Sequence, residues 1–470
     1  MSNHLSIHWI VEALHGRLTY GNPEREYRGI STDSRTIKPG EIFLALKGDT
    51  FDGHDFISEA IGKGALGVVV QSGRSVAQTK KDLIIIEVKD TLYALGDCAA
   101  QYRRLYDIPI VAVTGSNGKT TTKEMIAAVL SNKRRVLKNQ GNLNNLIGLP
   151  LSLLKLSSAH DVGVFELGMN RRGEIARLVD IAHPTVGIVT NVGPVHLEYL
   201  KTIEEVAEAK GELFQNLSPE ATAIINQDDP RIEKLSSRFS GEKITIGIKK
   251  PGDVTAKNIV PIGADGMRFD LVIREKTLPV FLPMIGAHNV MNALAAAGAV
   301  IALGEDPIMI SEGLKNFHNL NLRQQLITLP EGITIINDTY NANPVSMKKA
   351  LETFFLLQGS RRGIVILGDM LELGSQAAAL HRELGHEVAK MGIRLLIIMG
   401  QFSFDVREGA LSGGLFSSSI YIGRSHQDII DFLRGVLKPG DLVLVKGSRG
   451  MAMEKVVEGL MKKDNLLTVI

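Results

Sequence analysis

Short apolar runs separated by polar and amphipathic segments dominate the hydropathy pattern of this chain. In the first hundred residues IFLALKG (42–48), GVVV (67–70) and LIIIEV (83–88) predict strands, because short apolar runs bounded by turn residues are typical of buried strands. DFISEAIGKGA (55–65), between the first two runs, predicts a helix. These residues therefore predict a small α/β unit.

A repeated order of apolar strand, glycine turn and helix begins at Pro109. It is seen first in PIVAVTGSNGKTTTKEMIAAVL (109–130) and again at VGVFELG (162–168) and VGIVTNVG (186–193). Apolar strands that alternate with helices are typical of parallel strands covered on both faces by crossover helices. We therefore expect a second unit with a parallel sheet, followed by a helix-rich segment at 286–316.

Four further apolar strands mark a third section of the chain. They are predicted at ITIIND (333–338), GIVILGD (363–369), RLLIIMG (394–400) and DLVLVKGS (441–448), and each ends in glycine or a polar residue. Ligands of open α/β sheets bind at such carboxyl ends. This section is expected to form a Rossmann-like unit.

Three domains follow from these changes of pattern. PIVAVTG opens the first new sheet, and the polar stretch NFHNLNLRQQ (316–325) leads into the second. We therefore predict an α/β chain with domains at 1–108, 109–317 and 318–470. The length of 470 residues agrees, because it exceeds what one hydrophobic core usually serves.

The charge balance and the apolar stretches exclude several classes of protein. The chain has 53 Lys and Arg against 51 Asp and Glu, so we expect a small-molecule partner and no nucleic acid or membrane surface. The most apolar stretch (293–303) is too short to cross a bilayer, and MSNHLSIHWI lacks the pattern of a signal peptide. We expect a monomer without integral membrane contact, because no exposed assembly stripe is seen.

A single cysteine, Cys98, excludes an internal disulfide framework. It fits a reducing compartment, so we expect a cytoplasmic protein. Cys98 lies in TLYALGDCAAQYRRLY (91–106), which predicts an amphipathic helix, and is expected to be a small core residue.

Residues 110–122, IVAVTGSNGKTTT, place an apolar strand before a glycine-containing turn and a Lys-Thr pair that opens a helix. Gly115 and Gly118 allow the backbone to approach a ligand, and the N–H groups of the turn point at anionic oxygens. Lys119 is expected to neutralise the β- and γ-phosphates of a nucleotide, and Thr120 to offer its hydroxyl to Mg²⁺. The spacing differs from G-x-x-x-x-G-K-[ST], since a valine stands at the first glycine position. An ordinary turn with a surface lysine is the alternative.

Three candidate side chains follow the next two strands. Glu166 ends VGVF, where a carboxylate can hold a Mg²⁺ ion that bridges nucleotide phosphates. His196 lies in the loop after VGIVTNVG, and Lys210 lies on the predicted helix TIEEVAEAKGELF. A structural histidine and a solvated lysine on an acidic helix are the alternatives.

Two asparagines lie one turn apart in IGAHNVMNALAAAGAVIALG (285–304), an alanine-rich segment that predicts a helix. Asn289 and Asn292 can read a base edge or a ribose, or they can be helix-capping groups. In the third section, Asp338 and Tyr340 sit in a strand-to-helix turn, where a carboxylate can accept hydrogen bonds from ribose hydroxyls. Asn343, before Pro344, is predicted to cap the next helix, which would explain it without a function.

These motifs together resemble the Mur ligases. The loop TGSNGKT resembles theirs and that of the related folylpolyglutamate synthases, and the order Glu166, His196, Lys210 resembles their metal shell. The resemblance implies an ATP-dependent amide-bond ligase in which glutamate and histidine serve Mg²⁺ and Lys210 is carbamylated by carbon dioxide. A carbamate suits this place, because an ammonium would repel a dication whereas a carbamate is an oxygen ligand.

The same resemblance extends to ATP contacts. IGAHNVMNALAA resembles the G-x-H-N-x-x-N-x-L-A-A motif, in which the first asparagine lies against adenine. Arg323 aligns with an arginine that touches the γ-phosphate, although Leu322 stands where the family has glycine. The ATP-binding residues implied are Gly115, Ser116, Asn117, Gly118, Lys119, Thr120, Thr121, Asn289, Asn292, Arg323, Asp338 and Tyr340.

The first section also resembles the UDP-binding unit of these ligases, through STDSRTIKPGEIFLALKGDTFDGHDF (31–56). Ser31, Asp33, Ser34 and Arg35 are the implied uridine or pyrophosphate contacts. Asp-Ser-Arg alone would be assigned to an Asx-turn. Matching segments run from about residue 30 to 455, and so cover nearly all of the chain.

Within the family, NDTYNANP (337–344), GDMLELG (368–374), His381 and KGSRGMAME (446–454) resemble the members that add D-alanyl-D-alanine. The D-N-P-R motif of the diaminopimelate-adding members is absent from the sequence. The resemblance implies that the carboxylate of UDP-N-acetylmuramoyl-tripeptide is joined to D-alanyl-D-alanine through an acyl phosphate, with closure of the third domain onto the second. The implied dipeptide contacts are Asn341, Asn343, Lys446, Ser448 and Arg449.

Two rival functions share the phosphate loop. One is a Mur or folylpolyglutamate-type ligase that adds a different amine. The other is a nucleotide-controlled switch that hydrolyses ATP slowly, which would need neither a modified Lys210 nor a UDP pocket.

Overall fold

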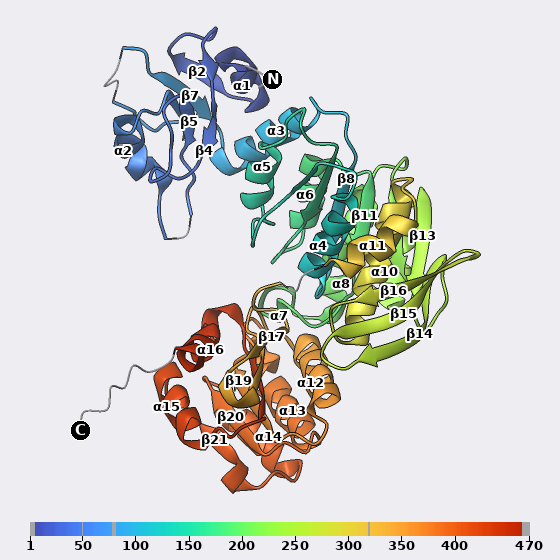
Figure 1. Cartoon of the computed structure of the whole chain (residues 1–470). Coiled ribbons are helices and arrows are strands. Elements are labelled where there is room, and N and C mark those ends of the chain that lie inside the picture. The colour runs from blue at the N-terminus through green and yellow to red at the C-terminus, as the bar shows by residue number, and fades with distance from the viewer. Residues whose placement is uncertain (1–4, 49, 78–80, 318–319, 463–470) are drawn as a thin grey trace.

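The computed structural model describes residues 5–48, 50–77, 81–317 and 320–462, which form three α/β units in series (Figure 1). In chain order their sheets have five, nine and six strands, and a two-stranded pair, β1 (Leu5–Ser6) with β3 (Glu26–Tyr27), accompanies the first. The predicted α/β class is confirmed. The boundaries near 108 and 318 stay a proposal, and they fall between the sheets.

The first unit has a mostly parallel sheet in which only the edge strand β2 is antiparallel. Its strands, in order across the sheet, are β2 (Arg17–Tyr20), β7 (Ile84–Val88), β6 (Gly67–Gln71), β5 (Glu41–Leu44) and β4 (Gly29–Ser31). Its helices are α1 (Ile7–Ala13), α2 (Ile57–Gly62), which follows a 3-10 turn, and α3 (Thr91–Arg103). Cys98 is fully buried, as predicted.

The central unit has a nine-stranded sheet that is parallel from β9 to β14 and antiparallel from β14 to β16. Across the sheet the strands are β16 (Lys276–Leu282), β15 (Gly266–Ile273), β14 (Val254–Ile262), β13 (Glu242–Gly247), β12 (Thr222–Asn226), β11 (Val186–Val189), β8 (Ile110–Thr114), β10 (Val162–Glu166) and β9 (Val136–Lys138).

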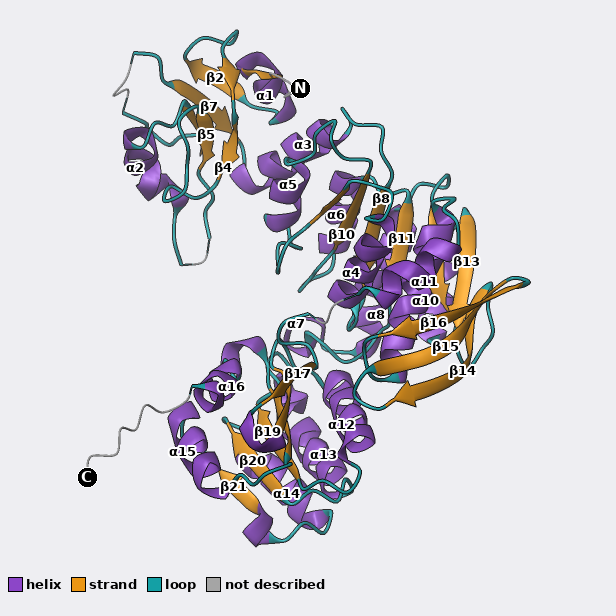
Figure 2. Ribbon diagram, viewed as in Figure 1, coloured by secondary structure: helices purple, strands orange, loops and turns teal. Residues whose placement is uncertain are grey.

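Helices cover both faces of this sheet (Figure 2). They are α4 (Lys119–Leu130), α5 (Gly148–Leu153), α6 (Glu174–Ala182), α7 (Leu197–Leu200), α8 (Ile203–Asn216), α9 (Pro230–Ser236), α10 (Ala287–Ala302) and α11 (Ile308–Lys315). Alternate residues of β8 point to opposite faces, so Val111 and Val113 pack with α4 and α10 while Ile110 and Ala112 pack with α6 and α8. The continuous apolar pattern of β8 follows from this double burial.

The third unit has a six-stranded sheet that is parallel apart from the edge strand β17. Across the sheet the strands are β17 (Gln325–Thr328), β18 (Thr334–Asp338), β22 (Leu442–Lys446), β19 (Gly363–Gly368), β20 (Leu395–Met399) and β21 (Ile420–Ile422). Its helices are α12 (Pro344–Gln358), α13 (Ala377–Ala389), α14 (Ser403–Ser412), α15 (His426–Val436) and α16 (Glu454–Met461). The helices α12 to α14 cover one face and α15 and α16 the other.

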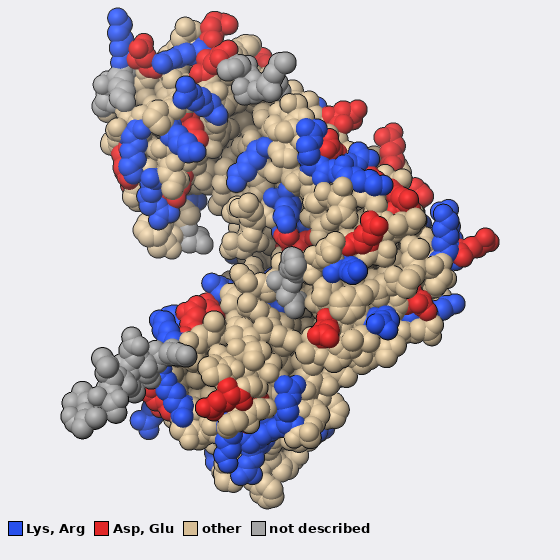
Figure 3. Space-filling model, viewed as in Figure 1, with Lys and Arg blue, Asp and Glu red and all other residues tan. Residues whose placement is uncertain are grey.

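The carboxyl ends of the central and third sheets face each other, and the first unit lies farther away in Figure 1. Basic and acidic side chains are interspersed over the face seen in Figure 3, in agreement with the small net charge. Within the described residues, no helix combines the length and apolarity needed to cross a membrane.

Candidate active site

A cleft of about 670 Å³ lies between the central and third units. Its wall includes residues that follow strands of both sheets, which is where open α/β sheets bind ligands. The predicted site residues that line it are Ser116, Asn117, Gly118, Lys119, Thr120, Thr121, Glu166, His196, Lys210, Asn289, Asn292, Arg323, Asp338, Tyr340, Asn341, Asn343, Lys446, Ser448 and Arg449.

The turn between β8 and α4 has the backbone geometry expected for phosphate binding. Gly115 and Gly118 have φ angles of +141° and +81°, which favour glycine. A Cβ on Gly115 would lie 2.0 Å from Thr190 Oγ1, so a side chain does not fit there. The helix α4 begins at Lys119, and its first N–H groups are without helical partners and available to an anion.

Lys119 and Thr120 follow this turn. Lys119 Nζ donates to the carbonyl oxygen of Gly115 at 3.0 Å, and burial lowers its pKa. The Thr120 hydroxyl donates to Glu166 Oε2 at 2.6 Å and accepts a hydrogen bond from Arg323 at 2.9 Å. Thr120 thus connects the phosphate loop to the end of β10 and to the third unit.

Glu166 ends β10 and is only 4% exposed. Its carboxylate accepts hydrogen bonds from Thr120 and from the Asn144 amide, the latter at 2.8 Å, and forms no ion pair with any described residue. The carboxylate is near enough to Lys119 and Lys210 to interact with them electrostatically, but it is bound directly only through hydrogen bonds, so this position suits a cation. Within the described chain, no three His, Cys, Asp or Glu side chains gather as a metal site. A carboxylate and a hydroxyl nevertheless fit Mg²⁺, which takes its other ligands from phosphates and water at nucleotide sites.

Lys210 lies on α8 and is 2% exposed. Three lysines are buried in the described ranges, and the other two, Lys123 and Lys446, each pair with a carboxylate. Lys210 makes no hydrogen bond or ion pair with the residues that the structure describes. Burial, and then the neighbouring Lys119, lower its pKa well below the usual value. Both effects favour the uncharged amine, which is the nucleophilic form of lysine.

His196 lies after β11, and its ring contacts the third unit. Its Nδ1 is 2.6 Å from Oε2 of Glu372, in the loop after β19. The hydrogen bond from His196 lowers the pKa of the Glu372 carboxyl. Both residues line the cleft, so this contact bridges the two units at the site itself.

Asn289 and Asn292 contact each other on α10, as their spacing predicts. Asn292 Nδ2 donates to Asn289 Oδ1 at 3.2 Å, and Asn289 Nδ2 donates to Gln324 Oε1 at 3.3 Å. Neither side chain caps the helix, whose N-cap is Gly286. The capping alternative is therefore wrong for these two residues.

Arg323 reaches the central unit from the start of the third. Its guanidinium donates to Thr120 and lies 3.9 Å from the centre of the Tyr340 ring. Leu322 has a φ of +63°, in the left-handed region that glycine favours. Leu322 therefore adopts the backbone conformation expected of the glycine that the family has at this position. Its carbonyl oxygen accepts a hydrogen bond from the Tyr340 N–H at 3.0 Å.

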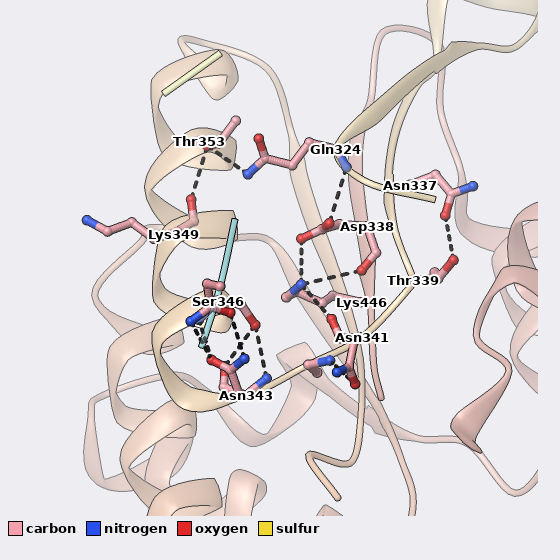
Figure 4. Close-up of polar contacts among 12 residues, drawn as sticks. Gln324, Asn337, Asp338, Thr339, Asn341, Asn343, Ser346, Lys349, Thr353 and Lys446 are labelled. Carbon is pink, nitrogen blue, oxygen red and sulfur yellow. Dashed lines mark hydrogen bonds and ion pairs between the residues drawn. The ribbon is translucent and has the colours of Figure 1, made fainter. Parts of the chain in front are cut away.

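Lys446, at the end of β22, is bound within the third unit (Figure 4). Its Nζ lies 2.5 Å from Asp338 Oδ2, 3.4 Å from the Asp338 carbonyl oxygen and 3.0 Å from the Asn341 carbonyl oxygen. These three acceptors account for all three N–H groups of the ammonium. Asp338 Oδ1 also accepts the backbone N–H of Gln324. Lys446 therefore shapes the turn after β18.

Ser448 has a similar internal role, whereas Arg449 does not. The Ser448 hydroxyl donates to the Ala342 carbonyl oxygen at 3.2 Å and accepts the Leu371 N–H at 2.9 Å. The Arg449 side chain is 59% exposed, and among the described residues its ion pair is with Glu454, at 3.0 Å. Of the predicted dipeptide contacts after β22, Arg449 is the one that remains available to a ligand.

Asn343 caps α12, as predicted. Its Oδ1 accepts the Ser346 N–H at 2.9 Å and its own N–H donates to the Ser346 hydroxyl, which completes a capping box (Figure 4). It also contacts the phosphate loop, because its Nδ2 donates to Asn117 Oδ1 at 2.7 Å. Asn343 therefore both caps α12 and joins the third unit to the phosphate loop.

The predicted contacts of the first unit are absent from the lining of this cleft. Asp33 Oδ1 accepts the Arg35 N–H at 2.9 Å, which forms the expected Asx-turn, and the two side chains form a bidentate ion pair. Ser31 accepts the Asp33 N–H at 3.2 Å, and Ser34 donates to Glu59 at 3.0 Å. Their roles toward UDP stay a prediction.

Sequence reasoning misses several residues that line the cleft, among them Asn144, His288, Gln324, Lys349 and Glu372. Burial lowers the pKa of His288 to about 4, so its ring is neutral at pH 7. His288 and Glu372 lie in the quoted segments GAHN and GDMLELG, and a polar residue after a strand or at a helix start is the signal that could have found them.

Three family models match the chain in succession. Residues 26–103 match the model described as Mur ligase family, catalytic domain, residues 113–300 match Mur ligase middle domain, and residues 322–449 match Mur ligase, glutamate ligase domain.

Similar proteins match along the whole length. The UDP-N-acetylmuramoyl-tripeptide–D-alanyl-D-alanine ligase of Bacillus subtilis (strain 168) is 36% identical over 456 residues, covering 96% of this chain and 97% of the relative. A crystal structure of MurF from Acinetobacter baumannii has a TM-score of 0.90 at 31% identity and covers 98% of this chain and 99% of its own. MurF ligase from Thermotoga maritima, in complex with ADP, has a TM-score of 0.81 at 29% identity, with 92% and 97% covered.

Proposed function

The chain belongs to the Mur ligase family, and we propose that it joins D-alanyl-D-alanine to UDP-N-acetylmuramoyl-tripeptide at the expense of ATP. The observation that carries the proposal is the cleft in which the phosphate loop, the buried Glu166 and the buried Lys210 meet the third unit. The names of the relatives and their full-length similarity support the choice of amine. The predicted reducing compartment favours the cytoplasm as the place of action.

ATP is expected to lie along the phosphate loop with its base toward α10. The N–H groups at the start of α4 and the Lys119 ammonium face its phosphates, and Arg323 approaches from the third unit. Asn289 and Asn292 offer amide groups to adenine or ribose from α10. The ADP complex of the Thermotoga maritima ligase supports nucleotide binding in this fold.

Mg²⁺ would be held by the Thr120 hydroxyl, Glu166, His196 and a carbamate on Lys210. When bound, it would offset the charge that spreads over the phosphate oxygens during transfer. The carbamate forms when the uncharged Lys210 amine attacks carbon dioxide and loses a proton, which converts an amine into an oxygen ligand. The burial of Lys210 without a partner supports this modification.

The reaction needs an activated acyl group, because a carboxylate is a poor electrophile. The terminal carboxylate of the tripeptide attacks the γ-phosphorus of ATP, and the bond between the γ-phosphorus and the oxygen that bridges it to the β-phosphate breaks. ADP departs, and an acyl phosphate is formed. The amine of D-alanyl-D-alanine then attacks the acyl carbon, phosphate departs, and the amine loses a proton. Lys119 and Arg323 stabilise the charge on the transferred group, and the third unit brings the dipeptide to the acyl carbon.

The two peptide substrates are assigned to opposite sides of the ATP site. Ser31, Asp33, Ser34 and Arg35 of the first unit are proposed to bind UDP. In the third unit, Arg449 is the proposed carboxylate anchor for the dipeptide, because its guanidinium is exposed at the cleft. Asn341 and Asn343 would add polar contacts beside it.

Phosphate release tests the proposal. The assay contains ATP and Mg²⁺, with UDP-N-acetylmuramoyl-tripeptide and D-alanyl-D-alanine added singly and together. Release that requires both substrates supports the proposal. Release that requires a different amine would identify another ligase of the family, and slow release that ignores both substrates would favour a nucleotide-controlled switch.

A further inference from the structure

The loop after β19 crosses to the central unit and contacts α7. The backbone N–H of Glu198 donates to the carbonyl oxygen of Glu372 at 3.1 Å. A Cβ on Gly374 would lie 3.3 Å from Glu198 Cα, so the backbone of the loop passes directly over α7. The Gln376 amide adds a hydrogen bond to the carbonyl oxygen of Lys201 at 3.5 Å. The two units are therefore joined through their backbones at this point.

The His196–Glu372 pair lies within this contact. The Nδ1–Oε2 distance of 2.6 Å joins side chains that are 23% and 45% exposed and 176 positions apart in the sequence. Both residues have positive φ angles, +55° for His196 and +62° for Glu372. Such backbone is unfavourable for a non-glycine residue and persists where the surrounding structure fixes it, often at functional sites.

The hydrogen bond determines which ring nitrogen of His196 carries the proton. A carboxylate only accepts, so Nδ1 donates to Glu372, and the neutral ring then has its lone pair on Nε2. An imidazole that acts as a ligand or acceptor through Nε2 needs this tautomer. A carboxylate on the other nitrogen is the common way in which proteins fix it.

The other carboxylates that line the cleft are engaged elsewhere. Glu166 is held by Thr120, and Asp338 is bound to Lys446. Asp228 accepts the backbone N–H groups of residues 248–250. Glu372 is therefore the lining carboxylate that meets an imidazole, and it comes from the other unit.

We propose that Glu372 is a positioning residue that fixes the tautomer and ring orientation of His196 from the third unit. His196 is then set for its role only while the third unit is docked, which links the arrangement of the units to the chemistry. This inference rests on the proposed function for the role of His196, although the tautomer itself can be measured without turnover.

Kinetics of the full-length chain test the inference with Glu372→Ala, Glu372→Gln and the matched control Glu198→Gln. The Ala variant should lower kcat by roughly 10–100-fold with little change in KM for UDP-N-acetylmuramoyl-tripeptide. The Gln variant should keep most of the activity, because its side-chain carbonyl oxygen still accepts from Nδ1. The Glu198 carboxylate is exposed, so its removal should change neither constant. A Gln variant as damaged as the Ala variant would overturn the positioning role, since charge would then be the required property.

Ring ¹⁵N NMR of the nucleotide-free chain gives a second readout, with the His196 signals assigned by loss in His196→Asn. Wild type and Glu372→Gln should show the Nδ1–H tautomer, and Glu372→Ala should shift toward Nε2–H. Identical ring shifts in wild type and Glu372→Ala would overturn the inference. Wild-type chain that releases no phosphate in the presence of both substrates would instead contradict the proposed function, while the ring shifts would still decide the role of Glu372.

Discussion

Two buried lysines, one on each side of the cleft, have opposite surroundings. Lys210 of the central unit and Lys446 of the third are each 2% exposed. Lys446 directs its three N–H groups to Asp338 and Asn341, whereas Lys210 has no bonding partner in the described chain. Burial lowers the pKa of Lys210, and the ion pair with Asp338 keeps a counter-charge beside Lys446.

The comparison shows how a buried lysine can be assigned a role. An ammonium that is buried with a carboxylate and two carbonyl oxygens holds backbone in place, and nothing is left over for a ligand. An amine that is buried alone has no structural gain to offset its burial, which points to a modification or a ligand. We therefore expect Lys210 to have a chemical role and Lys446 to have a structural one.

The largest expected effect comes from removing the unpartnered lysine. Lys210→Ala should lower kcat by roughly 10³-fold, because the proposed oxygen ligand near the phosphates is lost. Short carboxylic acids should restore part of the activity by occupying the vacated space. Phosphate release measured with and without such acids checks this, with wild type plus acid as the control. Absence of rescue, together with an unmodified mass for Lys210 in the wild type, would argue against a carbamate.

Removing the partnered lysine should act on stability instead. Lys446→Met leaves the Asp338 carboxylate without its counter-charge, which should lower the free energy of unfolding by about 3 kcal/mol. Lys349→Met, which breaks the exposed pair with Glu352, is the matched control and should change stability by at most about 0.5 kcal/mol. Urea denaturation measures both variants. Equal losses of unfolding free energy in the two variants would mean that Lys446 does not stabilise the turn after β18.

The sequence predicted the central side of the cleft better than the third side, and the contacts explain why. The turn at 115–120 and the position of Glu166 follow from strand, turn and helix order, which is local in the sequence. The bonding of Lys446 depends on Asp338, 108 positions away, and that of His196 on Glu372, 176 positions away. No local pattern reveals whether such side chains are free or already bound.

The prediction of the fold was limited for a different reason, since it depended on long apolar runs. The buried parallel strands β8, β10 and β11 were predicted, because their apolar runs are continuous. The strands β14 to β16 at the sheet edge were missed. In β15 buried residues alternate with exposed or half-buried ones such as Arg268, and β14 is buried only over its first three residues and is exposed at Lys257. No long apolar run therefore marks these strands.

A smaller effect is expected from changes to Asn343, which caps α12 in the third unit and also contacts the phosphate loop of the central unit. Asn343→Ala removes the cap of α12 and should cost about 1 kcal/mol of stability. Asn343→Ser can keep the cap but not the amide contact with Asn117. The Ser variant should therefore keep its stability while KM for ATP rises severalfold. Steady-state kinetics beside urea denaturation separates the two roles, and an unchanged KM in both variants would confine Asn343 to capping.

The smallest expected effect concerns Leu322, which holds the left-handed backbone before Arg323. Leu322→Gly and Leu322→Ala both remove the side chain, but only glycine adopts a φ of +63° without strain. The Gly variant should be more stable than the Ala variant by about 0.5–1 kcal/mol, because relief of strain exceeds the extra entropy of the unfolded glycine chain. Activity should be retained in the Gly variant, since the bond between the residue 322 carbonyl and the Tyr340 N–H uses backbone alone. An Ala variant at least as stable as the Gly variant would show that this backbone is not strained, and the leucine would then need another explanation.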